Sequence, residues 1–191
     1  SIYDVLIGEC DLSQAMQFSE HGGYQLLPAN RDLTAAEVAL LEMKMKESRL
    51  RYALAPIREN YDYILIDCPP SLNLLTINAM AAAHAILVPL QCEFFALEGL
   101  SQLLRTVERV RRSFNPMLQM HGIVLTMFDR RNNLSEQVAT DVRSFMGDRV
   151  YQTIIPRNVR ISEAPSHGKP VLLYDVRSPG AQAYAHLAGE M

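Results

Sequence analysis

Short apolar runs alternate with longer amphipathic stretches along most of this 191-residue chain. Several runs are apolar at consecutive positions, which is typical of strands buried on both faces. The stretches between them have the 3.6-residue periodicity of helices. This alternation predicts an α/β fold with a mostly parallel sheet and helices on both faces. The predicted strands are residues 24–27, 63–66, 85–90, 122–127, 151–155 and 171–173.

The helical stretches have identifiable ends. The stretch 97–114 is followed by Asn115-Pro116, a sequence that stops a helix, and the stretch 33–60 has Pro56 near its end, where we expect a break. The remaining predicted helices are residues 72–83, 133–146 and 179–189. Since no repeat or linker divides the chain, we expect a single domain over residues 1–191.

Composition narrows the class of protein. Hydrophobic residues make up 49% of the chain and charged residues 20%, which argues against disorder. No apolar run reaches the roughly 18 residues that a bilayer-spanning helix needs. The three cysteines are odd in number and far apart, which argues against a disulfide framework and a CxxC site. Because the first residues also lack the pattern of a signal peptide, we expect a cytoplasmic protein.

Charge is distributed unevenly along the chain. Residues 1–96 carry 6 basic and 12 acidic side chains, whereas residues 97–191 carry 12 basic and 9 acidic ones. Eleven of the 12 basic residues in the second half are arginines, whose planar fork suits phosphate and carboxylate. An ordinary solvated surface also explains this bias, so charge by itself does not establish nucleic-acid binding.

Polar segments follow four of the predicted strands. Ligands of parallel α/β sheets bind beyond the carboxyl ends of the strands, so we expect these segments to meet at one rim. They are Asp67-Cys68-Pro69-Pro70, Gln91-Cys92-Glu93, Phe128-Asp129-Arg130-Arg131 and Pro156-Arg157-Asn158.

The run 63–67 has the form of a Walker B element. An apolar strand that ends in an aspartate, here Asp67, places a carboxylate where it can orient Mg²⁺ or its water beside a nucleotide. Capping of the following helix is the alternative role for this aspartate. The sequence has no match to the P-loop pattern, since Gly168-Lys169 is followed by Pro170, and none to GxGxxG, HExxH or GxSxG. Residue chemistry thus predicts part of a nucleotide site without its phosphate cradle.

Arginines stand at two kinds of position. Arg130, Arg131 and Arg160 fall in or beside predicted loops, where a rigid scaffold can present them to phosphate. A row at i, i+4 and i+7 on the predicted helix 97–114 is interpreted as a solvated face instead.

Several strings of this sequence resemble the ParA/Soj chromosome-partitioning ATPases, a deviant Walker A class. Together they cover nearly all of the chain from Tyr61 onward, and the last string is long and specific. The resemblance implies a P-loop NTPase-like fold whose N-terminal strand, P-loop and helix are expected to lie outside these residues. The strings are YDYILIDCPPSL (61–72), LTINA (75–79), QCEFFALEGL (91–100), TMFD (126–129) and IPRNVRISEAPSHGKP (155–170).

The resemblance implies a role for each matching residue. Asp67 matches the Walker B aspartate, catalytic and close to Mg²⁺ through water. Cys68, Pro69 and Pro70 match switch II, which responds to the γ-phosphate, and Pro156 and Asn158 match the loop that holds adenine. Arg131 and Arg160 match positions that bind DNA without regard to sequence.

The resemblance also implies a cycle. ATP with Mg²⁺ promotes a homodimer on nucleoid DNA, and a ParB-type centromere-binding partner stimulates hydrolysis to ADP and releases the dimer. The cargo is a chromosome or a plasmid, and the protein is cytoplasmic and nucleoid-associated. Because these residues contain no signature lysine, we expect the chain as given neither to bind ATP tightly nor to hydrolyse it.

Two alternatives remain open. One is a non-catalytic module that binds DNA or a partner without nucleotide turnover. The other is a MinD-like, membrane-cycling ATPase, which would need a basic amphipathic helix at the C-terminus, whereas residues 185–191 carry no basic residue besides His186. We therefore expect no stable membrane association. Iron–sulfur carriers of the same ATPase class are disfavoured because no CxxC is present.

Overall fold

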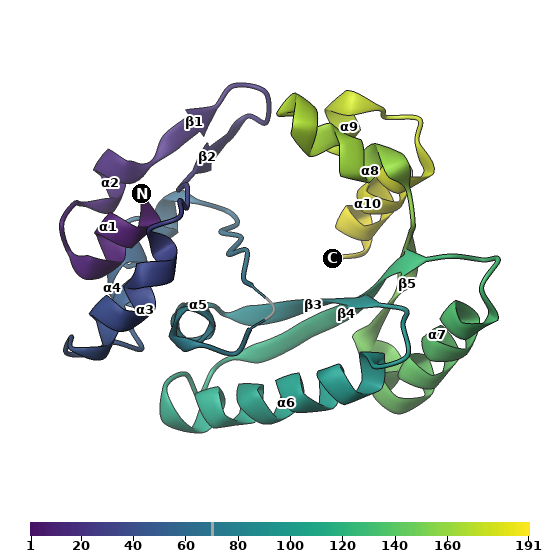
Figure 1. Ribbon diagram of the computed structural model, residues 1–191, viewed down its shortest axis with the longest axis horizontal. Coiled ribbons are helices and arrows are strands. Elements are labelled where there is room, and N and C mark those ends of the chain that lie inside the picture. Colours follow the sequence, from purple (N-terminus) through teal and green to yellow (C-terminus); the bar gives the residue numbers. More distant parts are fainter. Residues whose placement is uncertain (70) are drawn as a thin grey trace. The chain divides into compact units, whose positions relative to one another are not determined.

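The computed structural model describes residues 1–69 and 71–191 (Figure 1). The α-helices are α1 (Ile2–Ile7), α2 (Leu12–Ala15), α3 (Leu33–Leu41), α4 (Arg49–Leu54), α5 (Leu74–Ala82), α6 (Ala96–Ser113), α7 (Asn133–Met146), α8 (Val159–Glu163), α9 (Val171–Tyr174) and α10 (Pro179–Glu190). The strands are β1 (Gln17–Ser19), β2 (Tyr24–Leu26), β3 (Ala85–Gln91), β4 (Gln119–Phe128) and β5 (Val150–Pro156). Short 3-10 helices are η1 (Arg58–Asn60), η2 (Gly147–Arg149) and η3 (Ala164–His167).

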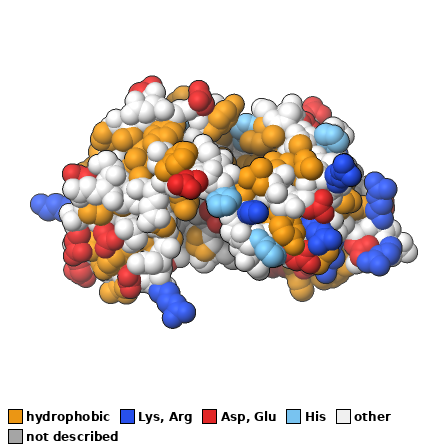
Figure 2. All heavy atoms as spheres, turned by 90° about the horizontal axis from the view of Figure 1, so that it is seen from above, with side chains coloured by type: hydrophobic (Ala, Val, Ile, Leu, Met, Phe, Trp, Pro, Cys, Tyr) orange, Lys and Arg blue, Asp and Glu red, His pale blue; other side chains and the backbone are white. Residues whose placement is uncertain are grey.

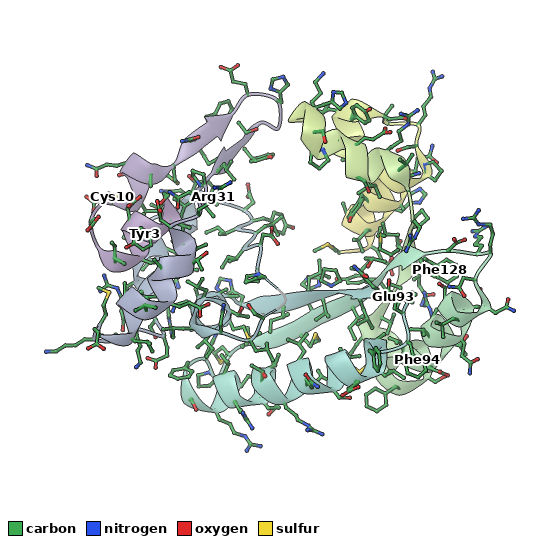
Figure 3. All side chains as sticks on the ribbon, in the orientation of Figure 1. Tyr3, Cys10, Arg31, Glu93, Phe94 and Phe128 are labelled. Carbon is green, nitrogen blue, oxygen red and sulfur yellow. The ribbon has the colours of Figure 1, made fainter. Side chains whose placement is uncertain are left out.

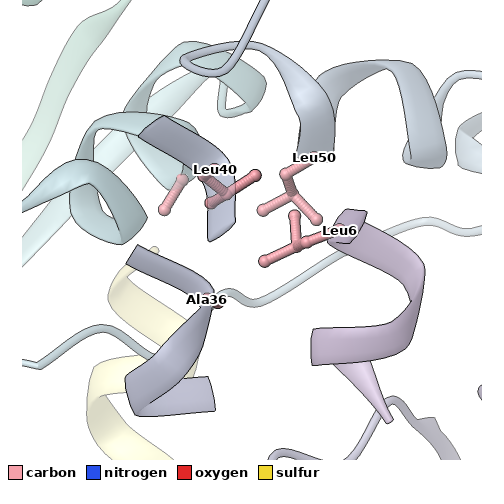
Figure 4. Packing of buried hydrophobic residues seen from close by; sticks show 5 residues of the cluster. Leu6, Ala36, Leu40 and Leu50 are labelled. Carbon is pink, nitrogen blue, oxygen red and sulfur yellow. The ribbon is translucent and has the colours of Figure 1, made fainter. Parts of the chain in front are cut away.

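The chain forms two compact units. The first unit comprises residues 1–85 and 103–119, and the second comprises residues 86–102 and 120–191. In the first unit α1, α3, α4 and α5 pack together, with Leu6, Leu40 and Leu50 buried between them (Figure 4). Beside this cluster β1 and β2 form a small antiparallel hairpin in which Ser19 pairs with Tyr24.

One buried amide ties the first unit together. Asn78 on α5 is only 1% exposed, and its side-chain oxygen accepts the Leu50 N–H at 3.1 Å. Its side-chain nitrogen donates to the Lys46 carbonyl at 2.6 Å and to the Leu74 carbonyl at 3.1 Å. A buried polar group is stable only when it is hydrogen-bonded, so Asn78 fixes α5 against the first turn of α4.

Replacing Asn78 with Ala is expected to lower the free energy of unfolding by about 2–4 kcal/mol, because it leaves the Leu50 N–H and Lys46 carbonyl without their partner. Urea-induced unfolding measures this change. The exposed Asn60 supplies the control, since Asn60→Ala should shift stability by no more than about 0.5 kcal/mol. Equal effects at the two positions would show that Asn78 does not tie the helices.

The second unit is built on the sheet β3-β4-β5. β4 and β5 pair in parallel, and β3 runs with β4, since the Gln119 N–H at the start of β4 donates to His84 just before β3. At the other end the Cys92 N–H, just after β3, donates to the Thr126 carbonyl of β4. The register of β4 on β5 pairs Ile123 with Val150, Leu125 with Ile154, and Phe128 with Pro156.

Helices cover both sides of β5. Both α7 and α10 contact it and lie on either side of it in Figure 1. Val124 of β4 and Ile155 of β5 are buried with Leu187 of α10, while Ile123 and Leu125 face the other way and are also fully buried. The predicted α/β fold with a parallel sheet and helices is thus confirmed. No helix within residues 1–69 and 71–191 combines the length and hydropathy needed to cross a membrane.

The predicted strand 63–66 is wrong. The structure has irregular backbone there, and Tyr63 and Leu65 are 84% and 87% exposed. An extended segment becomes a strand only when a neighbour takes up its backbone hydrogen bonds, and no strand of the described residues pairs with this one. Residues 63–66 have the apolar composition of a buried strand, but an apolar pattern does not show whether a neighbouring strand is present to pair with it.

Other predicted elements need correction too. Residues 171–173 lie in helix α9 instead of a strand. The helix starts directly after Pro170, whose carbonyl accepts the N–H groups of Leu173 and Tyr174. Residues 24–26 are a strand, but in the hairpin of the first unit rather than in the parallel sheet. The predicted helix 33–60 ends at Leu54, in agreement with the expected break near Pro56, but it is also interrupted over residues 42–48. The short helices α1, α2 and α8 were not predicted, since four to six residues hold too little periodicity.

Candidate functional site

Three strands of the second unit end together at one rim. The Cys92 N–H after β3 donates to Thr126 of β4 at 3.2 Å, and the Arg157 N–H after β5 donates to Phe128 at the end of β4 at 2.9 Å. Figure 3 shows Glu93 and Phe128 at this end of the sheet. The structure therefore brings together the predicted polar segments 91–93, 128–131 and 156–158. The described residues of the fourth segment, 67–69, belong to the first unit.

The end of β4 has an unusual backbone conformation. Met127 adopts a φ of 53°, a left-handed conformation that side chains other than Gly and Asn seldom take. The pairing of β4 with β5 is irregular between Leu125 and Phe128, next to this residue. Met127 thus redirects the chain just before the polar segment 128–131. Its residue type gives no sign of this conformation, so sequence reasoning missed it.

Pro156 is the last residue of β5, and Asn158 is the residue before α8. Both are half-buried, and Asn158 caps α8 through its side-chain oxygen, which accepts the Arg160 N–H at 3.0 Å. This bond fixes the amide and leaves its NH₂ group as a donor. A held amide donor beside a rigid proline can recognise the edge of a base, which is the chemistry that the predicted adenine role requires.

Gly180 at the start of α10 packs against this loop. A Cβ atom at Gly180 would lie 2.5 Å from the Ile161 Cδ1 of α8 and 3.2 Å from the Cβ of Asn158. Hence glycine at this position lets α10 approach the Asn158 loop without displacing the Ile161 side chain. The sequence offered no sign of this contact, since the spacing from Asn158 to Gly180 matches no motif.

Gly180→Ala is expected to destabilise the protein by about 1–2 kcal/mol, because the added methyl group must push α8 and α10 apart. Gly189 on the same helix is the matched control, since a Cβ there meets nothing within 4 Å. Gly189→Ala should leave stability within about 0.5 kcal/mol of the parent or raise it slightly. Thermal and urea unfolding of both variants test this, and equal responses would contradict the close approach.

Arg131 is joined to Asp129 in the loop between β4 and α7. Its Nε donates to Asp129 Oδ1 at 3.0 Å and its Nη2 to Oδ2 at 2.9 Å. These side-chain hydrogen bonds, reinforced by the Arg131 backbone N–H and the charge of Arg157, lower the pKa of Asp129 to about 2. The carboxylate therefore stays ionised at any physiological pH, while the Arg131 side chain is 88% exposed.

Arg131→Ala is expected to raise the pKa of Asp129 from about 2 toward the ordinary 3.8. A carboxyl with a lowered folded pKa stabilises the fold above its unfolded pKa, and this contribution disappears as pH falls from about 4 to about 2. The side-chain ¹³C shift of Asp129, followed by NMR through this range, reports its titration. A midpoint unchanged by the substitution would mean that Arg131 is not what holds the carboxylate.

Arg160, the second predicted DNA contact, has two carboxylate partners. Its Nη1 donates to Glu163 at 2.9 Å and its Nε lies 3.3 Å from Asp175. The Tyr174 hydroxyl also donates to Glu163 at 3.2 Å, and the Arg160 hydrogen bond lowers the pKa of Glu163. Both predicted arginines are thus oriented by acidic side chains of the same unit, a feature that single positions in the sequence do not reveal.

Asp67, Cys68 and Pro69 lie exposed in the irregular segment of the first unit. Asp67 has no hydrogen-bond or ion-pair partner among the described residues, so its carboxylate is available to a ligand. Partial desolvation, followed by the charge of Asp67, raises the pKa of the Cys68 thiol, which argues against a thiolate nucleophile here. Pro70, also predicted to line the nucleotide site, lies outside the described residues.

Each unit, taken by itself, has a residue whose chemistry suits one part of a nucleotide–Mg²⁺ complex. The hard carboxylate oxygens of Asp67 suit Mg²⁺ or its water, and the amide of Asn158 suits a base. Within residues 1–69 and 71–191 no group of three His, Cys, Asp or Glu side chains could hold a metal by itself. The P-loop that would cradle the phosphates has no match in this sequence.

Comparisons with known proteins identify the family. A family model described as an AAA domain matches residues 1–120. The chain is 60% identical over its whole length to the chromosome partitioning protein ParA of Caulobacter vibrioides, of which it covers 72%. It is 49% identical, again over its whole length, to the sporulation initiation inhibitor protein Soj of Bacillus subtilis, of which it covers 75%.

Solved structures lead to the same class of fold. Cobyrinic acid a,c-diamide synthase from Mycobacterium smegmatis, with bound ATP analog and magnesium, is 37% identical with a TM-score of 0.82 over 99% of this chain and 70% of that one. The cell division ATPase MinD of Pyrococcus furiosus is 25% identical with a TM-score of 0.78 over 100% of this chain and 74% of its own. The fold is thus that of the P-loop NTPases, and the chain belongs to the ParA/Soj family of chromosome-partitioning ATPases.

Proposed function

We propose that this protein, expressed from its complete reading frame, is an ATP-driven partition protein. It binds ATP with Mg²⁺, forms a homodimer, holds DNA without reading its sequence, and hydrolyses ATP when a ParB-type partner stimulates it. The observation that carries this proposal is the rim of the second unit, where Asn158 and Arg131 follow the ends of neighbouring strands. An amide that can bind a base and an arginine that can bind phosphate thus lie in loops that follow neighbouring strands of the same sheet.

Nucleotide binding in this proposal uses the residues that match the family's nucleotide-binding positions. Asp67 supplies the carboxylate near Mg²⁺, Cys68 and Pro69 belong to the segment that senses the γ-phosphate, and Pro156 and Asn158 hold adenine. The related synthase with a bound ATP analog and magnesium supports this cofactor assignment at 37% identity. Because the 191 residues contain no P-loop match, we expect this stretch alone not to turn over ATP.

DNA binding rests on Arg131 and Arg160. Both guanidinium groups are at the surface of the second unit, and Lys and Arg side chains gather at the right of the face seen in Figure 2. Arginine forks grip phosphate oxygens without reading bases, so such binding is independent of sequence and weakens with salt. The protein would then reside in the cytoplasm on the nucleoid.

Identity favours the partition role over the MinD-like alternative. The ParA relative is 60% identical over the whole chain, whereas the MinD structure is 25% identical. Since relatives at 45–60% identity are named chromosome partitioning proteins or Soj, a chromosome is the favoured cargo over a plasmid.

The ATPase rate tests this proposal. It is measured for the protein alone, with DNA, with its ParB-type partner, and with both. A partition ATPase should be slow alone and rise by about tenfold or more with both additions, because each ligand shifts the population of the switch segments. A rate that stays at the basal level with both present would contradict the proposed function.

A further inference from the structure

We propose that Asp129 is a positioning residue that sets the guanidinium of Arg131 for a DNA phosphate. The inference rests on the proposed function, because it assigns to Asp129 a part in the DNA contact of Arg131. In this proposal Asp129 has a role in DNA binding in addition to its role in the stability of the loop.

The hydrogen bonds leave one side of the guanidinium open. Asp129 takes the Nε donor and one Nη2 donor of Arg131, at 3.0 and 2.9 Å. A guanidinium has five N–H donors, so both N–H groups of Nη1 and one of Nη2 remain. Two of those three, one on each Nη nitrogen, point off the end of the fork, where a phosphate can accept two parallel bonds. The same side chain can therefore bridge the carboxylate and a phosphate.

The carboxylate is itself held by the backbone. Asp129 Oδ1 also accepts the Arg131 N–H at 3.0 Å, and the Asp129 carbonyl accepts the Asn132 N–H at 3.0 Å. Asn132 in turn caps α7, since its side-chain oxygen accepts the Leu134 N–H at 3.0 Å. The loop from the end of β4 to the start of α7 is thus tied at successive residues. Asp129 is a fixed support, and the exposed Arg131 is oriented from it.

Two opposing effects decide what Asp129 does for DNA binding. The negative charge of Asp129 repels phosphate. Its hydrogen bonds to Arg131, in contrast, restrict the arginine side chain before DNA binds, which lowers the conformational entropy lost on binding. The repulsion is offset in part by the positive charge of Arg157, which also acts on Asp129, and salt weakens it further, while orientation is not screened. We therefore expect orientation to outweigh repulsion at physiological salt.

The adjacent arginine shows what the arrangement adds. Arg130 is also exposed, but it has no ion-pair partner among the described residues. Arg131 is held by a single carboxylate at two points, and that carboxylate leaves the end of its fork open. Of the two neighbouring arginines, Arg131 is therefore the one that a carboxylate orients before DNA binds.

The test measures DNA affinity of the protein expressed from its complete reading frame, with a non-hydrolysable ATP analogue, by fluorescence anisotropy on a short duplex. Asp129→Asn should weaken binding by about three- to tenfold at ~0.15 M salt. Asp141→Asn, which removes the same charge from an exposed position on α7, should leave affinity unchanged. In the Arg131→Ala background Asp129→Asn should cost nothing further, because the two residues act as a unit.

A second background separates positioning from damage to the loop. Lysine cannot make the two-point contact, so in an Arg131→Lys protein Asp129→Asn should not weaken binding further. A loop that simply unfolds without Asp129 would weaken binding in that background too, and this result would overturn the inference. If Asp129→Asn bound DNA as tightly as the parent while Arg131→Ala bound it weakly, the carboxylate would only neutralise the charge of Arg131 and would not position it. Parent-like binding by Arg131→Ala would refute the proposed DNA contact itself, and the role of Asp129 with it.

Discussion

Asp67→Asn is expected to abolish ATP turnover by the protein expressed from its complete reading frame, with kcat falling by about 100-fold or more. The substitution keeps the size of the side chain but removes the charge that would orient Mg²⁺ or its water. Asp67 is exposed and has no hydrogen-bond or ion-pair partner among the described residues, so the fold loses nothing with it. The expected result is an inactive protein that remains as stable as the parent.

Asp62 provides the matched control for this prediction. It is an exposed aspartate five residues earlier in the same segment, and Asp62→Asn should leave both turnover and the Mg²⁺ dependence unchanged. Steady-state rates across a Mg²⁺ titration, together with thermal unfolding, separate the two positions. If Asp67→Asn kept parent-like turnover, or lost it only by unfolding, the assignment of Asp67 to the metal would be wrong.

Arg131→Ala is expected to weaken DNA binding by about tenfold at physiological salt and to make its salt dependence shallower by about one unit per protein copy. The guanidinium is 88% exposed and already oriented by Asp129, so it can meet a phosphate with little loss of freedom. Because the contact is to phosphate, the loss should be the same on DNA duplexes of different sequence.

Arg130→Ala removes the same charge from the neighbouring position and should have the smaller effect, since Arg130 lacks the carboxylate support. Binding isotherms at several salt concentrations give both affinity and slope for each variant. Equal losses at Arg130 and Arg131 would mean that charge alone matters in this loop. No loss at either position would move the DNA contact elsewhere.

The elements best predicted from the sequence are those whose apolar residues are covered by tertiary packing. β3, β4 and β5 begin and end within about three residues of the predicted runs, and α7 has the predicted bounds, because continuous apolar runs and a clear amphipathic pattern coincide with real burial there. The run 63–66 has the same apolar pattern and forms no strand. The difference is a hydrogen-bonded neighbour, which a local pattern cannot reveal.

The rim was predictable in outline and not in detail. Because the carboxyl ends of parallel strands lie at one edge of a sheet, the segments after β3, β4 and β5 were expected to meet, and they do. The bond between Asp129 and Arg131, the left-handed Met127 and the approach of Gly180 to Asn158 were not foreseen. Each depends on backbone conformation or on residues far apart in the chain, which periodicity and composition do not encode.

ATP-controlled association with DNA tests the central claim most directly. The protein from its complete reading frame is titrated with two duplexes of unrelated sequence, in the presence of ATP, of ADP and of no nucleotide, at increasing salt. The account predicts binding with ATP that is equal for both sequences, falls steeply with salt, and is much weaker with ADP or without nucleotide. Binding that ignores the nucleotide, or that selects one of the sequences, would contradict it.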